Sequence, residues 1–174
     1  MTMPPRVRKL ALVLHVAASV GWLGGVAAFL ALALVGLNGT DEQTVRAVYV
    51  SMDLVTRFVL VPLALASLAT GIIQSLGTTW GLLRYWWVVV KLLLTLVATG
   101  ILLLHTQPIA FMARAAQGSL AAGAHADVRL QLVVISAAAI ALLLVTTGLS
   151  VFKPPGVTRY GWRKQREERL AARV

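Results

Sequence analysis

The sequence contains no cysteine and few charged residues. Without cysteine, the chain has no disulfides, thiolate catalysis, iron–sulfur clusters or cysteine-ligated zinc sites. Only 13% of the 174 residues are charged, whereas soluble domains average about 25%. Acidic residues are the scarcest, with six Asp and Glu against sixteen Lys and Arg. This is not the composition of a soluble globular protein.

Hydrophobic residues make up 59% of the chain, and the mean hydropathy is +0.83. Four apolar runs reach the length of about 20 residues that a helix needs to cross a bilayer. We therefore expect an all-α fold, a polytopic membrane four-helix bundle in one domain (1-153), with spans at about 9-37, 54-76, 85-106 and 128-152. The first run is too long for the apolar region of a signal peptide, so we expect it to be a retained helix.

The net charge of +10 is concentrated at the two termini. Four spans place both termini on one side of the membrane, and the positive-inside rule makes that side the cytoplasm. The segment 154-174 is then a basic cytoplasmic tail, surface-bound or disordered, that contacts anionic lipid headgroups. We expect no nucleic acid partner, because no motif for binding RNA or DNA accompanies the charge.

The connections and breaks follow from local signals. Residues 38-53 are polar and are expected to form a loop, and Asp53 lies four residues before Arg57, a spacing that pairs them. Pro62 is expected to kink the second helix, and Pro108 to follow the end of the third. Residues 107-127 form a longer, partly helical connection in which His125 is solvated.

The first span carries small residues at helical spacing. Gly21 and Gly25 form a small-xxx-small pair, a pattern typical of close helix packing in membranes. His15, Trp22 and Gly25 share one stripe. This face packs either within one bundle or between protomers, so a homo-oligomer remains open.

Two ionisable residues lie within the third span, where such residues are costly and mark candidate functional sites. Lys91 and His105 are 14 residues apart and share one helix face, about 21 Å apart along the axis. His15 and Lys91 each lie about 9–10 Å in from the cytoplasmic side. We therefore expect these two residues in one inner layer, with Gln74 near it, and His105 in an outer layer near Arg57 and Asp53.

The inner layer suits a haem group. A neutral imidazole ligates iron, and a desolvated lysine can lose its proton and do the same. An apolar slot between bundle helices suits the macrocycle. Cations for its propionates are available near the interface at Arg6, Arg8, Lys9, Arg84 and Lys153. The alternative is that Lys91 snorkels to the interface and His15 hydrogen-bonds inside a cofactor-free structural or accessory protein.

The residues Leu14-His15-Val16, Gly21-Trp22-Leu23-Gly24-Gly25, Lys91 and Lys153-Pro154 occur in an order that resembles a broad group of bacterial membrane proteins. The group includes HemJ-type protoporphyrinogen oxidases and CopD-type copper-resistance proteins. The resemblance implies that His15 and Lys91 bind the iron of haem b, with Trp22 and Gly25 beside the cofactor. It also implies a multi-pass protein of the bacterial cytoplasmic membrane acting in porphyrin or electron-transfer redox chemistry, as a HemJ-like oxidoreductase if it is an enzyme.

The chain departs from the HemJ-type pattern at two places: Val89 replaces a histidine, and residues 28-31 replace the usual end of the first helix. It is also similar to small uncharacterised four-helix membrane proteins of actinobacterial type, which imply no activity. A two-haem cytochrome is disfavoured because Phe29 stands 14 residues after His15. Copper or small-molecule transport is the other alternative, with scattered donors at Met52, Met112, His105 and His125.

Overall fold

The computed structural model describes residues 3–78, 81–118 and 125–171. Its named elements are all helices: α1 (Pro5–Asn38), α2 (Glu42–Val55), the π-helical segment η1 (Thr56–Leu60), α3 (Val61–Gly77), α4 (Trp86–Ala115), α5 (Ala126–Phe152) and α6 (Arg159–Ala171). Four helical stretches are long and apolar enough to cross a membrane: Pro5–Asn38, Glu42–Gly77, Trp86–Ala115 and Ala126–Phe152. The expectation of an all-α chain with four membrane-compatible helices is confirmed.

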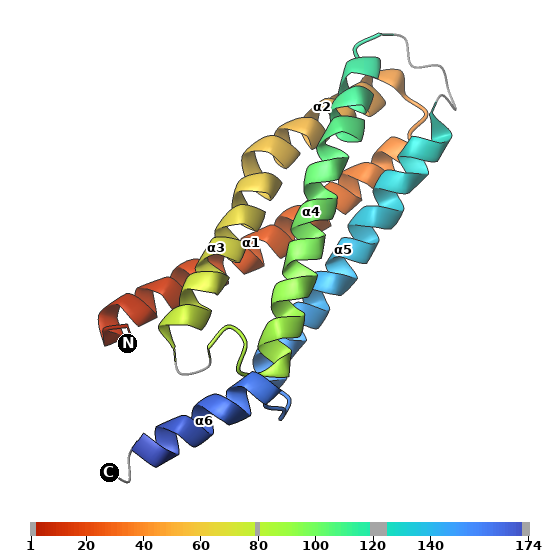
Figure 1. Cartoon of the computed structure of the whole chain (residues 1–174). Coiled ribbons are helices and arrows are strands. Elements are labelled where there is room, and N and C mark those ends of the chain that lie inside the picture. Colours follow the sequence, from red (N-terminus) through yellow and green to blue (C-terminus); the bar gives the residue numbers. More distant parts are fainter. Residues whose placement is uncertain (1–2, 79–80, 119–124, 172–174) are drawn as a thin grey trace.

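The four long stretches form one elongated bundle (Figure 1). Helix α1 packs against α2, α3 and α5, while α4 packs against α2, α3 and α5. Both chain termini lie at the same end, here named the terminal end, and the α1–α2 connection, the end of α4 and the start of α5 lie at the other, here named the loop end (Figure 1). Which end faces the cytoplasm stays a prediction.

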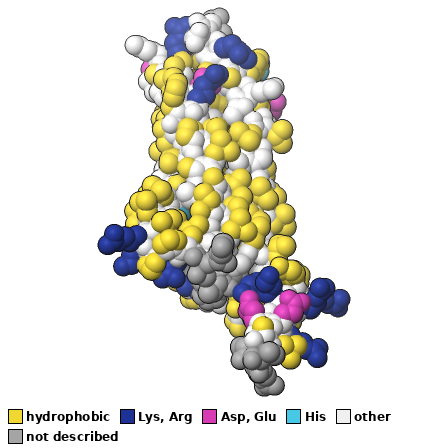
Figure 2. Space-filling view, turned by 60° about the vertical axis from the view of Figure 1, so that its left-hand side comes forward, with side chains coloured by type: hydrophobic (Ala, Val, Ile, Leu, Met, Phe, Trp, Pro, Cys, Tyr) yellow, Lys and Arg dark blue, Asp and Glu magenta, His cyan; other side chains and the backbone are white. Residues whose placement is uncertain are grey.

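The helices bury narrow stripes and expose wide apolar faces. In α1 the buried residues recur at spacings of three and four: His15, Ala18, Trp22, Val26, Phe29, Ala33 and Gly36. Large apolar side chains point outward, with Leu104 of α4 75% exposed. Figure 2 shows hydrophobic side chains covering the middle of the bundle and Lys and Arg gathered toward its two ends. This surface suits a lipid environment, in which outward-facing side chains meet hydrocarbon.

Small residues let α1 approach the second span closely. A Cβ on Gly21 would lie 3.2 Å from Leu63, and one on Gly25 would lie 2.8 Å from Leu60. Gly21 and Gly25 therefore pack within the chain, against α3 and η1.

The prediction of a loop over residues 38-53 is wrong, because α2 begins at Glu42. Asp41 caps this helix, accepting a hydrogen bond from the Thr44 backbone N–H at 2.8 Å. The Thr44 hydroxyl and this N–H hold the pKa of the Asp41 carboxyl below its usual range. A buried stripe of Val45, Val48, Tyr49 and Met52 holds the helix in the bundle. Its polar residues face outward, which made the segment resemble a loop.

Pro62 lies at the start of α3, next to a π-helical turn. Proline lacks an N–H and cannot make the helical hydrogen bond to the carbonyl four residues earlier. Just before it, the Val61 N–H bonds to the Thr56 carbonyl five residues back, the wider π-helical spacing. Met52, Thr56, Leu60 and Ala64, four residues apart, are all buried across this turn. The second span is thus continuous from Glu42 to Gly77.

The prediction that the third helix ends before Pro108 is also wrong. Pro108 lies inside α4, which continues to Ala115. Ile109, Met112 and Ala113 are buried beyond the proline, so packing holds this segment helical. The Arg46 side chain satisfies carbonyls at the end of α4, donating to Ala116 at 2.7 Å and to Gln117. Residues 119–124 of the expected connection lie outside the described residues.

Two further features lie at the loop end. Arg129 of α5 is buried, donates to the Gly36 carbonyl at 3.4 Å and lies over the Tyr49 ring at 5.8 Å. A cation here complements the negative end of the α1 dipole. His125 is exposed, as expected, and packs edge-on against Phe111.

The tail is not a loose segment, because residues Arg159–Ala171 form helix α6 clamped to the connection before α4. The Thr158 hydroxyl donates to the Leu83 carbonyl at 2.5 Å and accepts from the Gly161 N–H at 3.0 Å. Arg84 and Glu168 form an ion pair at 2.7 Å. The α6 helix is thus fixed at the terminal end of the bundle (Figure 1).

Candidate functional site

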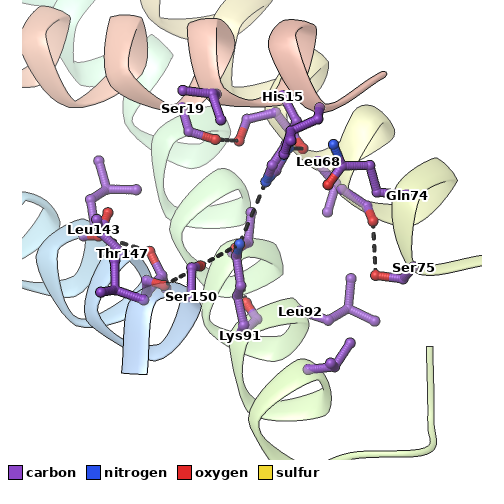
Figure 3. A pocket seen from close by; sticks show the side chains of 18 of the residues that line it. His15, Ser19, Leu68, Gln74, Ser75, Lys91, Leu92, Leu143, Thr147 and Ser150 are labelled. Carbon is purple, nitrogen blue, oxygen red and sulfur yellow. Dashed lines mark hydrogen bonds between the residues drawn. The ribbon is translucent and has the colours of Figure 1, made fainter. Parts of the chain in front are cut away.

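A cavity of about 660 Å³ opens between α1, α3, α4 and α5 near the terminal end. Its size falls within the range of small-molecule and cofactor sites, about 300–1,000 Å³. His15 and Lys91 line it from opposite sides (Figure 3). Its other polar lining residues include Ser19, Ser67, Gln74, Ser75, Thr95, Thr146, Thr147 and Ser150, and its apolar ones Trp22, Leu23, Leu92 and Leu143.

The His15 ring is oriented by α3. Its Nδ1 lies 3.1 Å from the Ser67 backbone carbonyl and 3.0 Å from the Thr70 hydroxyl. A carbonyl oxygen only accepts, so Nδ1 carries the hydrogen and the neutral ring keeps its lone pair on Nε2. The Thr70 hydroxyl donates onward to the Ala66 carbonyl at 2.6 Å. This arrangement turns Nε2 away from α3 and into the cavity.

Lys91 meets that lone pair from α4. Its Nζ lies 3.5 Å from His15 Nε2 and donates to the Ser150 hydroxyl of α5 at 2.6 Å. Figure 3 shows the three side chains converging from three helices. The Ser150 hydroxyl donates in turn to the Thr146 carbonyl at 2.9 Å. A single polar cluster therefore joins α1, α3, α4 and α5 inside the bundle.

Gly71 makes room for the histidine. A Cβ at this position would lie 3.1 Å from His15 Cε1, tighter than an ordinary contact. The ring is consequently packed on one side against the backbone of α3 and hydrogen-bonded to that same helix. Ser19 adds a second link between the two helices, since its hydroxyl lies 2.8 Å from the Ser67 hydroxyl.

Only some of the other residues expected around a cofactor line the cavity. Trp22 is buried and lines the cavity. Gln74 lines it too, and its buried Nε2 has no hydrogen-bond partner among the described residues. Gly25 does not line the cavity; it is a packing position against Leu60. Of the cations proposed for propionates, Arg8 and Lys153 line the cavity and the other three do not.

The residues expected in the outer layer, Asp53, Arg57 and His105, do not form one cluster. Arg57 and Asp53 pair at 2.9 Å, as their spacing predicts. His105 instead turns toward α5: its Nδ1 lies 2.8 Å from the Ile101 carbonyl, and Gln131 Nε2 lies 3.3 Å from its Nε2. His105 is therefore a helix-linking residue remote from the cavity.

Sequence reasoning missed the residues that orient the His15 and Lys91 side chains. Ser67, Gly71 and Ser150 carry no motif, and Ser67 and Gly71 were visible only as a small, polar side of the second span. Their role depends on the rotation of each helix about its axis. A signal existed in the grouping of Ser67, Thr70 and Gly71 on one helix side, but the partner helix was not specified.

Among residues 3–78, 81–118 and 125–171, no three His, Cys, Asp or Glu side chains come together in a group able to hold a metal ion. Comparisons of the chain with protein-family models, curated proteins and solved structures found no match. The resemblance to HemJ-type and CopD-type proteins therefore rests on the sequence motifs alone. The four membrane-compatible helices support a multi-pass membrane protein.

Proposed function

We propose that this chain is an integral membrane protein that binds haem b between α1 and α4, with His15 and Lys91 as axial ligands. The observation that carries the proposal is the facing pair of nitrogens, His15 Nε2 and Lys91 Nζ, 3.5 Å apart. These two nitrogens would hold the iron of a bound haem.

The surroundings of His15 support a ligand role. Metal-ligating histidines almost always donate their other ring N–H to a carboxylate, a backbone carbonyl or water, which fixes the tautomer and the ring orientation. His15 meets this condition through the Ser67 carbonyl. Lys91 can bind iron only as its neutral amine. The Ser150 hydroxyl, which accepts a hydrogen bond from Lys91 Nζ, remains a hydrogen-bond partner for the amine after it loses its proton.

When bound, the haem would supply one-electron chemistry whose potential depends on its axial ligands. In the oxidoreductase version of the proposal, the chain acts on a porphyrin in the bacterial cytoplasmic membrane, with both termini in the cytoplasm. His15 and Lys91 would hold the iron, and Trp22 and Leu143, which line the cavity, would provide apolar contacts for the macrocycle.

A cofactor-free structural or accessory role is the second candidate. It is favoured by the same contact, since Lys91 already donates to Ser150 and lies within hydrogen-bond reach of His15. Hydrogen-bonded polar pairs of this kind stabilise the association of membrane helices by about 0.6 kcal/mol each. In this version the cluster serves only to hold the four helices together.

An absorption spectrum of the protein purified in mild detergent separates the two candidates. Haem binding gives a Soret band, with or without added haem, that His15→Ala and Lys91→Ala each shift or abolish. His105→Ala is the matched control, because His105 lies outside the cavity. No Soret band after haem addition rejects the proposal, and indifference to both variants rejects the ligand assignment. A protoporphyrinogen oxidation assay then distinguishes an enzyme from a haem carrier.

A further inference from the structure

A second, smaller cavity lies at the loop end, between η1 and α4. Its volume is about 420 Å³, and it is lined by Arg57, Thr106, Gln107, Ala110 and Arg114. Two arginines from different helical elements thus face one space. Ala110 is buried and belongs to the wall of the cavity, whereas both arginines are exposed.

The hydrogen-bond donors of this cavity are only partly used. Arg57 donates through Nε to Asp53 at 2.9 Å, and its terminal nitrogens have no hydrogen-bond partner among the described residues. Arg114 has no carboxylate partner among the described residues. The Thr106 hydroxyl donates to the Leu103 carbonyl at 2.8 Å and so offers only its lone pairs. With Asp53 counted, the local charge is about +1.

The depth of the cavity points to a lipid headgroup. Helix α4 begins at Trp86, and twenty residues at 1.5 Å each carry it about 30 Å, the thickness of the hydrocarbon core, to Thr106. The cavity that Thr106 shares with Arg57 and Arg114 is therefore placed at the headgroup level of the leaflet at the loop end. Below them toward the membrane centre, Phe58 and Leu104 are 74% and 75% exposed, which suits acyl chains.

We propose that Arg57 and Arg114 form a site for the phosphate of an anionic glycerophospholipid in the leaflet at the loop end. Guanidinium groups bind phosphate through paired hydrogen bonds. The residual positive charge selects a headgroup whose phosphate charge is not cancelled, such as phosphatidylglycerol, over phosphatidylcholine. The site is independent of the cavity around His15 and of the basic α6 helix at the opposite end.

Native mass spectrometry of the detergent-solubilised protein with added phosphatidylglycerol or phosphatidylcholine tests this site. We expect retention of phosphatidylglycerol over phosphatidylcholine, and a loss of about tenfold or more in R57Q/R114Q, since each interfacial arginine strengthens binding several-fold. The variant R163Q/R166Q removes the same charge from α6 and is expected to retain this lipid. D53N frees Arg57 and is expected to tighten binding.

Equal retention of the two lipids by the wild-type chain overturns the proposal, as does undiminished phosphatidylglycerol binding by R57Q/R114Q. The wild-type comparison needs no variant and stands even if the double variant is unstable, which circular dichroism of its helices reveals. A final arm adds inorganic phosphate or glycerol phosphate. Displacement of the lipid by either at millimolar concentration identifies a free-anion site and also rejects the lipid assignment.

Discussion

The Nε2 atom of His15 and the Nζ atom of Lys91 lie 3.5 Å apart, although 76 positions separate the residues in the chain. Each nitrogen is aimed by a different neighbour, His15 by the Ser67 carbonyl of α3 and Lys91 by the Ser150 hydroxyl of α5. The contact therefore depends on four helices at once. A perturbation of any of them is expected to change it, and the predictions below use this dependence.

Gly71→Ala is expected to displace the His15 ring, because the new methyl group would lie 3.1 Å from Cε1. Overpacking of this kind costs roughly 1–3 kcal/mol, more than the roughly 0.5–1 kcal/mol that alanine gains over glycine inside a helix. The thermal unfolding midpoint in detergent should fall. Gly100→Ala is the control, since a Cβ there meets nothing within 4 Å; a similar fall in both variants contradicts the packing argument.

Lys91→Met tests how the lysine would bind iron, and it rests on the proposed haem function. Lysine competes with a proton for its lone pair, so haem ligation in the wild type should weaken as the pH falls. Methionine is an established axial ligand that does not titrate. The variant's Soret band should therefore be less sensitive to acid than that of the wild type. Identical acid sensitivity of both bands argues that Lys91 is not a ligand.

Gly161→Ala is expected to release α6 from the bundle. A Cβ at this position would collide with the backbone carbonyl of Arg84, which has no flexible end to move aside. Trypsin should then cleave at the basic residues of α6 several-fold faster. Gly156→Ala provides the comparison, because its Cβ would meet Trp86 at an ordinary 3.7 Å. Equal cleavage rates in the two variants show that α6 is not held by this contact.

Asp41→Asn is expected to remove a pH dependence from the start of α2. The pKa of the Asp41 carboxyl is lowered in the folded chain by the hydrogen bonds from Thr44. Its stabilisation is therefore present above the unfolded pKa and is lost as the pH falls through the folded pKa. Asparagine is also a good N-cap and does not titrate. Hydrogen exchange of the Thr44 amide should accelerate relative to the variant on acidification; parallel behaviour of the two proteins excludes this linkage.

The orientation in the membrane is testable with single cysteines, because the chain has none of its own. Thr40→Cys lies at the loop end and Ala171→Cys at the end of α6, and both positions are exposed. If the termini are cytoplasmic, a membrane-impermeant maleimide should label Thr40→Cys in intact cells. It should label Ala171→Cys only after permeabilisation. The reverse pattern would invert the predicted topology.

The sequence alone was enough to predict the four helices, the common end of the termini and the shared depth of His15 and Lys91. The number of helices and the common end of the termini follow from the four apolar runs of membrane-spanning length. The third follows because an α-helix rises a constant 1.5 Å per residue from the interface at which it enters. These properties depend only on distances along single helices, and such distances can be counted directly from the sequence.

The tertiary structure alone decided how each helix is rotated and where packing overrides local signals. Residues 42–55 and the stretch beyond Pro108 are helical because their buried faces pack in the bundle, despite polar residues in one and a proline in the other. Gly25 faces Leu60 while Ser67, Gly71 and Ser150 face the His15–Lys91 pair. Such neighbours are set by interhelical contacts between distant residues, whose energies no single stretch of sequence contains.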